Sequence, residues 1–222
     1  MSLASEPDQN PVLKRVTHTT SRLFAKAVAI LIQSIPTEEQ LPTERLKRLL
    51  AQDDYQLYSY HMDGDPVGSA LLYVPAGGEF AWLDYMAVRD DTRGRGIGSS
   101  LFREIVRLIN RDRKAARWLL FEVDDDREGS DCARQTNLRR IEFYRRLGAH
   151  LLANVPYRFP NANGLVVPMR LMVYPMRQVS DFTTGVVQRA VQDVFEGIHD
   201  RHQDDPLLRW FLERVPSELV VE

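Results

Sequence analysis

A segment rich in glycine and arginine carries the strongest chemical signal in this sequence. It reads Arg93-Gly94-Arg95-Gly96-Ile97-Gly98 and joins an apolar stretch, residues 80–89, to a segment of helical periodicity that begins at Ile97. Glycines allow close backbone approach, and the free N–H groups of a helix start, here extending to Ser99, attract anions. The segment therefore predicts a phosphate or pyrophosphate site, to which Arg93 and Arg95 add positive charge.

Two common phosphate-binding motifs do not fit this segment. A dinucleotide fingerprint needs a third glycine where Leu101 stands, and no acidic residue follows at the expected spacing. A P-loop needs Gly-Lys-Ser/Thr, which is absent. A glycine-rich helix start that binds no ligand remains an open interpretation.

The elements that must position this segment form a mixed pattern. Strand-like stretches precede the glycine segment, with a strong turn signal at Asp63-Gly64-Asp65-Pro66, and strands and helices alternate after it. This order predicts an α/β fold, with a central twisted mixed sheet flanked by helices. The expected strands are 15–20, 55–62, 66–74, 80–89, 118–123, 149–157 and 165–174, and the expected helices are 21–35, one capped by Thr43, 97–116, 137–147, 186–198 and 207–215.

The chain is expected to divide into three parts. Residues 1–11 form a flexible leader, residues 12–177 form the catalytic-type domain, and residues 178–222 form a C-terminal helical extension. The extension is too small for an independent core. It either packs on the domain or mediates a homodimer.

Two sequence blocks resemble the GNAT superfamily of acetyl-CoA-dependent N-acetyltransferases. Arg93-x-x-Gly96-x-Gly98 matches that superfamily's Arg/Gln-x-x-Gly-x-Gly/Ala signature, and LDYMAV before it resembles the fourth strand. In the second block Asn137 precedes Tyr144 by seven residues, and Gly148 follows by four, as in the family. One departure is Ala149, where members commonly carry an aromatic residue.

The resemblance implies how coenzyme A would be held. The N–H groups of residues 94–99 would bind the pyrophosphate, and backbone groups of Met86, Ala87 and Val88 would pair with the pantetheine arm. Asn137 matches a residue that hydrogen-bonds this arm, although a helix N-cap would look the same. One backbone N–H of the 86–88 stretch would stabilise the developing oxyanion.

Three side chains are candidates for acid–base chemistry. Tyr144 matches the family's general acid, which would protonate the departing thiolate; alternatively it belongs to a core stripe of its helix. Asp84 lies where many members carry a carboxylate that faces the acceptor, and Glu122 is on the neighbouring strand. Either could accept a proton through water, hold a cationic amine, or form a salt bridge at a strand end.

Other polar and aromatic groups allow weaker expectations. The helix after the glycine segment carries Arg103, Arg107 and Arg111. These arginines either neutralise the 3′-phosphate of coenzyme A or form a solvated face of the helix. Residues 124–126 are three aspartates that could attract an amine or form a polar loop. An acceptor pocket could use Tyr157, Phe159 and Pro160, which could equally cover core.

Composition excludes several classes of function. The net charge is −2, from 29 basic and 31 acidic residues, which gives no reason to expect nucleic acid. No apolar run is long enough to span a membrane, and the single Cys132 fits a reducing compartment, so cytoplasm is expected. No metal is expected, because the histidine spacing suggests no site; His199 and His202 are assigned to a solvated helix end.

Together these features predict an N-acetyltransferase. It would move an acetyl group from acetyl-CoA to an amine of a small molecule or peptide by direct attack in a ternary complex. The alternative is a non-catalytic acyl-CoA-binding or regulatory module that recruits a partner through its C-terminal helices. A nucleotide-binding scaffold that uses the same loop is a third interpretation.

Overall fold

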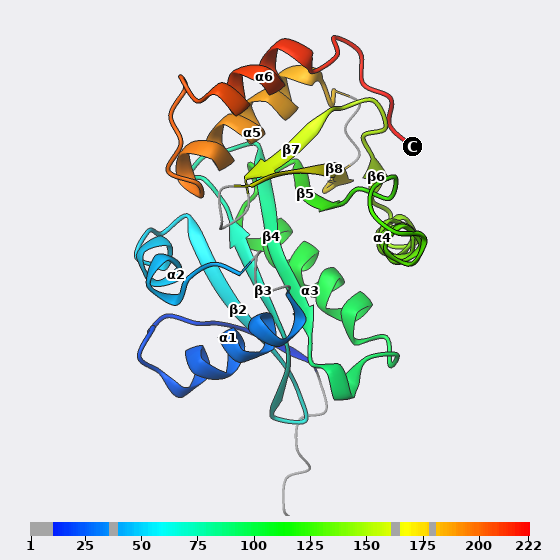
Figure 1. The fold of residues 1–222 in the computed structure, drawn as a ribbon. Coiled ribbons are helices and arrows are strands. Elements are labelled where there is room, and N and C mark those ends of the chain that lie inside the picture. The colour runs from blue at the N-terminus through cyan, green and yellow to red at the C-terminus, as the bar shows by residue number, and fades with distance from the viewer. Residues whose placement is uncertain (1–10, 36–39, 161–164, 178–180) are drawn as a thin grey trace, which may run out of the picture.

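A computed structural model describes residues 11–35, 40–160, 165–177 and 181–222. Within these residues the chain builds one eight-stranded mixed sheet, in the order β1-β2-β3-β4-β5-β8-β6, with β7 paired to β8. Helices cover both faces of the sheet (Figure 1). The mixed α/β fold with a central sheet, expected from the sequence, is confirmed.

The first half of the sheet is an antiparallel meander of β1 (Val12–Arg15), β2 (Tyr55–Met62), β3 (Asp65–Tyr73) and β4 (Phe80–Val88). The predicted turn between β2 and β3 forms at Asp63 and Gly64, which both have positive φ angles, 52° and 84°. Asp-Gly suits such a turn, since its twist matches that of the flanking strands.

The second half of the sheet follows a crossover. A short 3₁₀ turn (Asp90–Thr92) and α3 (Ile97–Asp112) lead from β4 to β5 (Trp118–Asp124), which runs parallel to β4. The remaining strands are antiparallel: β6 (His150–Leu151), β7 (Tyr157–Pro160) and β8 (Val166–Pro175).

One face of the sheet is covered by α1 (Arg22–Ser34), α2 (Thr43–Leu50), α5 (Thr184–Gly197) and α6 (Pro206–Arg214). Their apolar residues share a core with inward side chains of the strands, including Trp82 and Trp118. Side-chain caps fix two of these helices, because Ser21 accepts from the N–H of Phe24 and Asp205 accepts from the N–H groups at the start of α6. We call this side the α1/α5 face.

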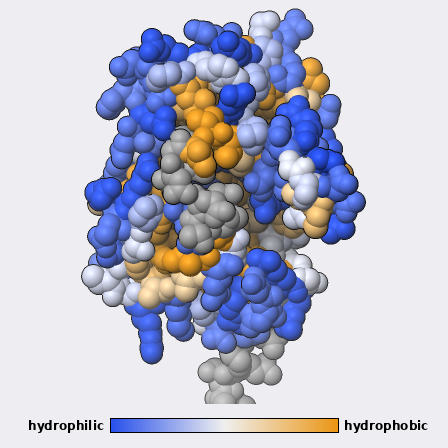
Figure 2. Space-filling view, in the orientation of Figure 1, coloured by the Kyte–Doolittle hydropathy of each residue, from blue (hydrophilic) through white to orange (hydrophobic). Residues whose placement is uncertain are grey.

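The other face is covered by α3 and α4 (Asp131–Arg145). The buried stripe of α3, with Leu101 and Ile105, packs against strand residues such as Leu119 and Phe121. We call this side the α3/α4 face. The outer surfaces of the helices are mostly hydrophilic, whereas apolar residues gather in the middle of the view in Figure 2.

The C-terminal segment is packed into the fold where it is described. Val187, Val191 and Phe195 of α5 are fully buried in the same core as the sheet. Farther on, a bridge pairs Leu152 with Val221 beside β6. Residues 1–10 of the predicted leader, and residues 178–180 at the predicted boundary, lie outside the described residues.

Several element boundaries differ from the predicted ones. The first strand is Val12–Arg15 rather than 15–20, and Thr43 is the first residue of α2, which Pro42 precedes as the N-cap. Helix α4 begins at Asp131, capped by Ser130, six residues before the predicted start. Its first two turns carry no buried apolar residue, so apolar periodicity could not reveal them. The expected strand 149–157 is instead the short β6 and, separately, β7, whereas β8 matches the expected strand 165–174 to within one residue at each end.

Candidate active site

A β-bulge in β4 determines where the acidic side chain of this strand lies. Leu71 pairs with Tyr85 and Leu72 with Leu83, so Asp84 is the extra residue of β4. Asp84 and Tyr85 therefore both lie toward the α1/α5 face, where Asp84 contacts Tyr55 and Tyr85 packs against the core. The bulge thus aims a carboxylate at the middle of the sheet.

The two parallel strands separate immediately before this bulge. The β4–β5 ladder consists of Phe80–Trp118, Ala81–Leu119 and Trp82–Leu120, and it ends there. Beyond it the two strands line a pocket of about 360 Å³ from opposite sides, β4 with residues 83–88 and β5 with residues 121–124. The pocket therefore opens where the sheet splits.

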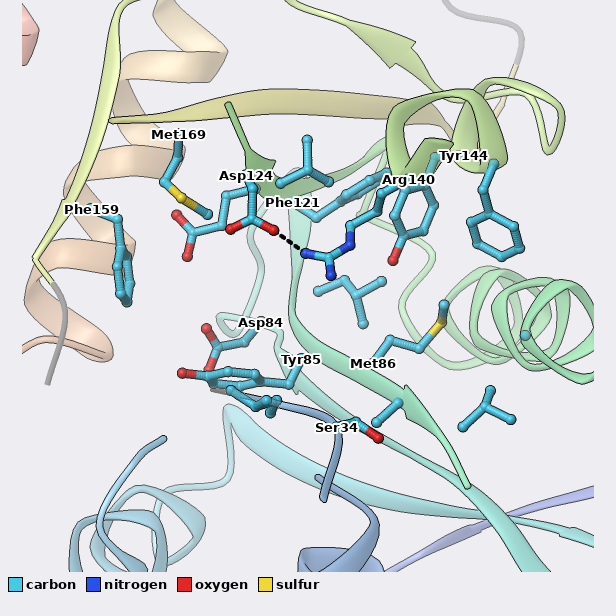
Figure 3. A pocket seen from close by; sticks show the side chains of 18 of the residues that line it. Ser34, Asp84, Tyr85, Met86, Phe121, Asp124, Arg140, Tyr144, Phe159 and Met169 are labelled. Atoms are coloured by element: carbon cyan, nitrogen blue, oxygen red, sulfur yellow. Dashed lines mark hydrogen bonds and ion pairs between the residues drawn. The ribbon is translucent and has the colours of Figure 1, made fainter. Parts of the chain in front are cut away.

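This pocket receives side chains from both faces of the sheet (Figure 3). Tyr144, Phe143 and Gly98 come from α4 and α3 on the α3/α4 face. The α1/α5 side carries Asp84 and, on β5, Glu122. We call these two sides the donor half and the acceptor half. The gap between the strands connects them.

The donor half ends at the start of α3. Gly96 is the N-cap of this helix, with φ of 76° and no side-chain capping bond, so the first N–H groups are not capped by a side chain. A left-handed residue at this point favours glycine. Arg93, which lines the pocket, donates to the Ser34 hydroxyl at 3.3 Å and pairs with Asp90 on the surface.

Tyr144 presents its hydroxyl to the pocket. The ring is buried against Phe102, Phe121 and Phe143, with centroids 4.5–5.4 Å away, and the oxygen points into the cavity (Figure 3). Burial raises the pKa of this phenol to about 12, although the charge of nearby Arg140 opposes the rise. Tyr144 therefore keeps its proton at neutral pH and has it available to donate.

Asp84 is the counterpart in the acceptor half. Its Oδ2 accepts a hydrogen bond from the hydroxyl of Tyr55. Burial raises the pKa of Asp84 to about 6, and the bond from Tyr55 and the charge of Arg45 limit that rise. A carboxylate with such a pKa is ionised at neutral pH and basic enough to take up a proton.

Glu122 forms a similar arrangement with a second tyrosine. The hydroxyl of Tyr157 is buried next to Glu122, and its pKa is raised well above the usual range by burial and by the charges of Glu122 and Asp84. Both carboxylates therefore belong to one acidic group whose neighbours are phenols. Tyr55 and Tyr157 remain protonated there and can act as donors.

A salt bridge crosses the upper wall of the pocket. Arg140 of α4 pairs with Asp124 at the end of β5 (Figure 3). The other two aspartates of the predicted acidic run also face arginines, with Arg170 bonded to Asp126 at 2.8 Å and Arg127 bonded to Asp125 at 2.6 Å. The run thus forms a paired loop that fixes the end of β5.

The structure places the sequence-predicted residues in two groups. Those that line the pocket are Asp84, Met86, Ala87, Val88, Arg93, Gly98, Glu122 and Tyr144. Those outside its lining are Gly94, Arg95, Gly96, Ile97, Ser99 and Asn137. Ile97 is buried in the core under α3, whereas Gly94, Arg95 and Gly96 are exposed at the helix start.

Asn137 does not occupy a helix N-cap, which corrects that alternative. It lies in the interior of α4, and its side-chain amide donates to the carbonyl of Asp125 at 3.0 Å. In this position it ties α4 to the loop after β5. Two of the three arginines on α3 pair with neighbouring acids, Arg107 with Glu104 and Arg111 with Asp112.

Sequence reasoning missed the residues that support the site. Tyr55 and Arg140 carry no local motif, and only the strand register and the crossover bring them to the pocket. His199 was expected at a solvated helix end, but it packs against Phe159 and Phe195, with ring centroids 5.1 and 5.9 Å away. Burial and two nearby arginines lower its pKa to about 3, so it is neutral.

Two other kinds of site are absent from the described residues. None of their helices is long and apolar enough to cross a membrane. No group of three or more histidine, cysteine or acidic side chains in those ranges is arranged to hold a metal ion.

Comparison with known proteins agrees with this geometry. The acetyltransferase (GNAT) family model matches residues 26–149. Aminoglycoside N(6′)-acetyltransferases type 1 from Klebsiella pneumoniae and Serratia marcescens are 26% identical over 124 residues, which is 51% of this chain. That match spans only about half the length of these curated relatives, 56%.

Solved structures share the fold at lower identity. A GNAT-family protein from Bacteroides thetaiotaomicron superposes with a TM-score of 0.66 at 20% identity, over 84% of this chain and 99% of its own. An aminoglycoside 6′-N-acetyltransferase complexed with coenzyme A superposes with a TM-score of 0.56 at 17% identity. The superposition covers 77% of this chain and 99% of that structure's chain. Because the family model matches more than half of the residues, the chain belongs to the GNAT family of acetyltransferases.

Proposed function

We propose that this chain transfers an acetyl group from acetyl-CoA to a primary amine by direct attack. The observation that carries the proposal is the split between β4 and β5. Because the strands separate there, the phenol of Tyr144 on one side of the sheet and the carboxylate of Asp84 on the other side line the same pocket. A proton donor and a proton acceptor on opposite sides of a gap suit a reaction between two substrates that enter from opposite faces.

The donor half fits coenzyme A in two respects. Beyond Trp82 the backbone of β4, including Met86, Ala87 and Val88, lines the pocket on the side where its ladder with β5 has ended. A pantetheine arm could therefore pair with these backbone groups as an added strand does. The start of α3, with Gly96 as N-cap and Arg93 beside it, suits the pyrophosphate.

The bound thioester would supply the activated acetyl carbon. Asp84 takes a proton from the acceptor ammonium, directly or through a water molecule, and so frees the amine lone pair. The nitrogen–carbon bond forms first, and a backbone N–H of β4 stabilises the resulting oxyanion. The carbon–sulfur bond then breaks as Tyr144 donates its proton to the departing sulfur. The second proton of the amine nitrogen passes through water to the Tyr144 phenolate, and Asp84 releases the first proton to solvent.

Glu122 supports this step from the neighbouring strand. Its charge lies close to the same part of the pocket, where it would hold a cationic amine before deprotonation. The step uses a carboxylate and a phenol for its proton transfers and needs no metal. The names of the curated relatives make an aminoglycoside one acceptor to test.

A thermal-shift screen followed by a thiol-release assay tests the proposal. Acetyl-CoA should stabilise the purified chain, whereas ATP and NAD should not, and pooled amines should make release of free coenzyme A faster. Stabilisation without amine-dependent release would indicate a non-catalytic acyl-CoA-binding module. Stabilisation by ATP or NAD alone would indicate a nucleotide-binding scaffold instead.

A further inference from the structure

The acceptor half of the pocket combines two kinds of surface. Its charged groups, among the described residues, are the carboxylates of Asp84 and Glu122 and that of Asp124, which is paired with Arg140. Around them lies an apolar wall, which we define by side chains from three strands and the residue after α1. The apolar wall consists of Ile35, Tyr85, Phe159, Val167 and Met169.

The apolar wall is held firmly from behind. Phe159 is only 8% exposed, and its ring lies edge-on to the neutral imidazole of His199. Tyr85 packs against the core of the α1/α5 face, as do Val167 and Met169. Phe159 and Met169 stand across the pocket from Asp84 and Tyr85 in Figure 3. The wall is therefore a preformed surface next to the carboxylates.

From this arrangement we propose that the acceptor is a small monoamine whose single ammonium group is attached to an aromatic or aliphatic body. The inference rests on the proposed function, since it assigns the acceptor of that reaction. The carboxylates of Asp84 and Glu122 hold the nitrogen, and the apolar wall covers the body. Apolar burial then contributes to affinity, and the two charges position the reacting nitrogen.

A polycationic acceptor fits this half poorly. Each additional ammonium or hydroxyl group would lie against the apolar wall, where it loses its hydration without gaining a partner, or beside Asp124, whose charge is already paired with Arg140.

Acceptor preference tests the inference. With acetyl-CoA saturating, coenzyme A release is measured for 2-phenylethylamine, hexylamine, spermidine and kanamycin. We expect kcat/KM for 2-phenylethylamine and hexylamine to exceed that for spermidine and kanamycin by about tenfold or more, since a site built for apolar groups discriminates on that scale. Preference for spermidine or kanamycin would overturn the inference and leave the proposed function intact.

A matched pair of variants locates the effect in the apolar wall. Val167 lines the pocket, whereas the adjacent Val166 is 46% exposed and does not. Val167→Asn should raise the KM for 2-phenylethylamine by about tenfold with little change in the KM for acetyl-CoA, and Val166→Asn should change neither. Equal KM values in the two variants would contradict the assignment.

Calorimetric titration of 2-phenylethylamine in the presence of coenzyme A separates the two proposals. Binding that weakens in Val167→Asn, without acetyl transfer to any amine, would contradict the proposed function and support the acceptor assignment. Absence of both binding and transfer would overturn both proposals.

Discussion

The hydroxyl of Tyr55 donates a hydrogen bond to Oδ2 of Asp84, which joins the first residue of β2 to the bulge residue of β4. These residues lie on strands separated by β3, and the bulge brings the carboxylate within reach of the phenol. The bond holds the Asp84 side chain in one orientation and favours its charged form, against the effect of burial.

Removal of this bond should change the pH dependence of the reaction. In Tyr55→Phe the pKa of Asp84 should rise above about 6, because a hydrogen bond that stabilises the carboxylate is lost. The acid limb of the pH profile of kcat/KM would then shift to higher pH by about one unit. Tyr58→Phe, a change on the same strand whose side chain packs on the α3/α4 face, is the control and should leave the limb in place. An unshifted limb in Tyr55→Phe would remove Asp84 as the base.

Asp84 should also cost the protein stability at neutral pH. Its pKa is raised to about 6 in the folded chain, whereas the unfolded chain keeps a value of about 4. The penalty for burying the charge is thus absent below pH 4 and complete above pH 6. Asp84→Asn should increase the free energy of unfolding by about 1–3 kcal/mol at pH 8, with little effect at pH 4.

Denaturant unfolding at the two pH values measures this difference. Asp65→Asn makes the same chemical change at an exposed position and should be neutral at both. The stabilised Asp84→Asn protein should meanwhile lose about a hundredfold or more in turnover. Wild-type turnover in that variant would show that Asp84 does not take part in catalysis.

The phenol of Tyr144 is expected to matter for turnover and little for binding. Tyr144→Phe keeps the buried ring and removes the oxygen that points into the pocket, so kcat should fall by about a hundredfold. The dissociation constant of acetyl-CoA should stay within about threefold, since the ring is unchanged. Tyr174→Phe, in the same aromatic cluster but outside the pocket lining, is the control. Similar kcat values in both variants would contradict the general-acid role.

Charge beside the α3 start should determine affinity for the donor. Arg93→Glu places a negative charge on the wall of the donor half and should weaken acetyl-CoA binding by about tenfold or more, most clearly at low salt. Arg209→Glu on α6 makes the same change on an exposed helix and serves as the reference. Calorimetric titration of both variants measures the effect, and equal affinities would place the phosphates elsewhere.

Local patterns in the sequence were enough to predict the central part of the fold. The apolar runs of β2, β3 and β4, the Asp63-Gly64 turn and the apolar stripe of α3 each lie in a single continuous stretch, so a local pattern is enough to predict them. The same holds for the glycines at the start of α3. The predicted element boundaries were wrong where an element begins with polar residues, as in the first turns of α4.

The remaining parts of the site depend on long-range geometry. The proximity of Tyr55 and Asp84 follows from strand order and from a one-residue bulge, neither of which leaves a local signature. His199 looks like a surface residue in its polar stretch, yet the packing of α5 beside β7 brings it against Phe159. The pairing of the acidic run with Arg140 and Arg170 likewise requires α4 and β8 to be in place.

Product analysis tests the central claim most directly. The chain is incubated with acetyl-CoA labelled in its acetyl group and a pool of primary amines, and mass spectrometry follows the label while a thiol reagent follows free coenzyme A. We expect labelled amide and free thiol in equal amounts, with both reduced in Tyr144→Phe. Thiol release that is the same with and without amines, and no labelled amide, would contradict it.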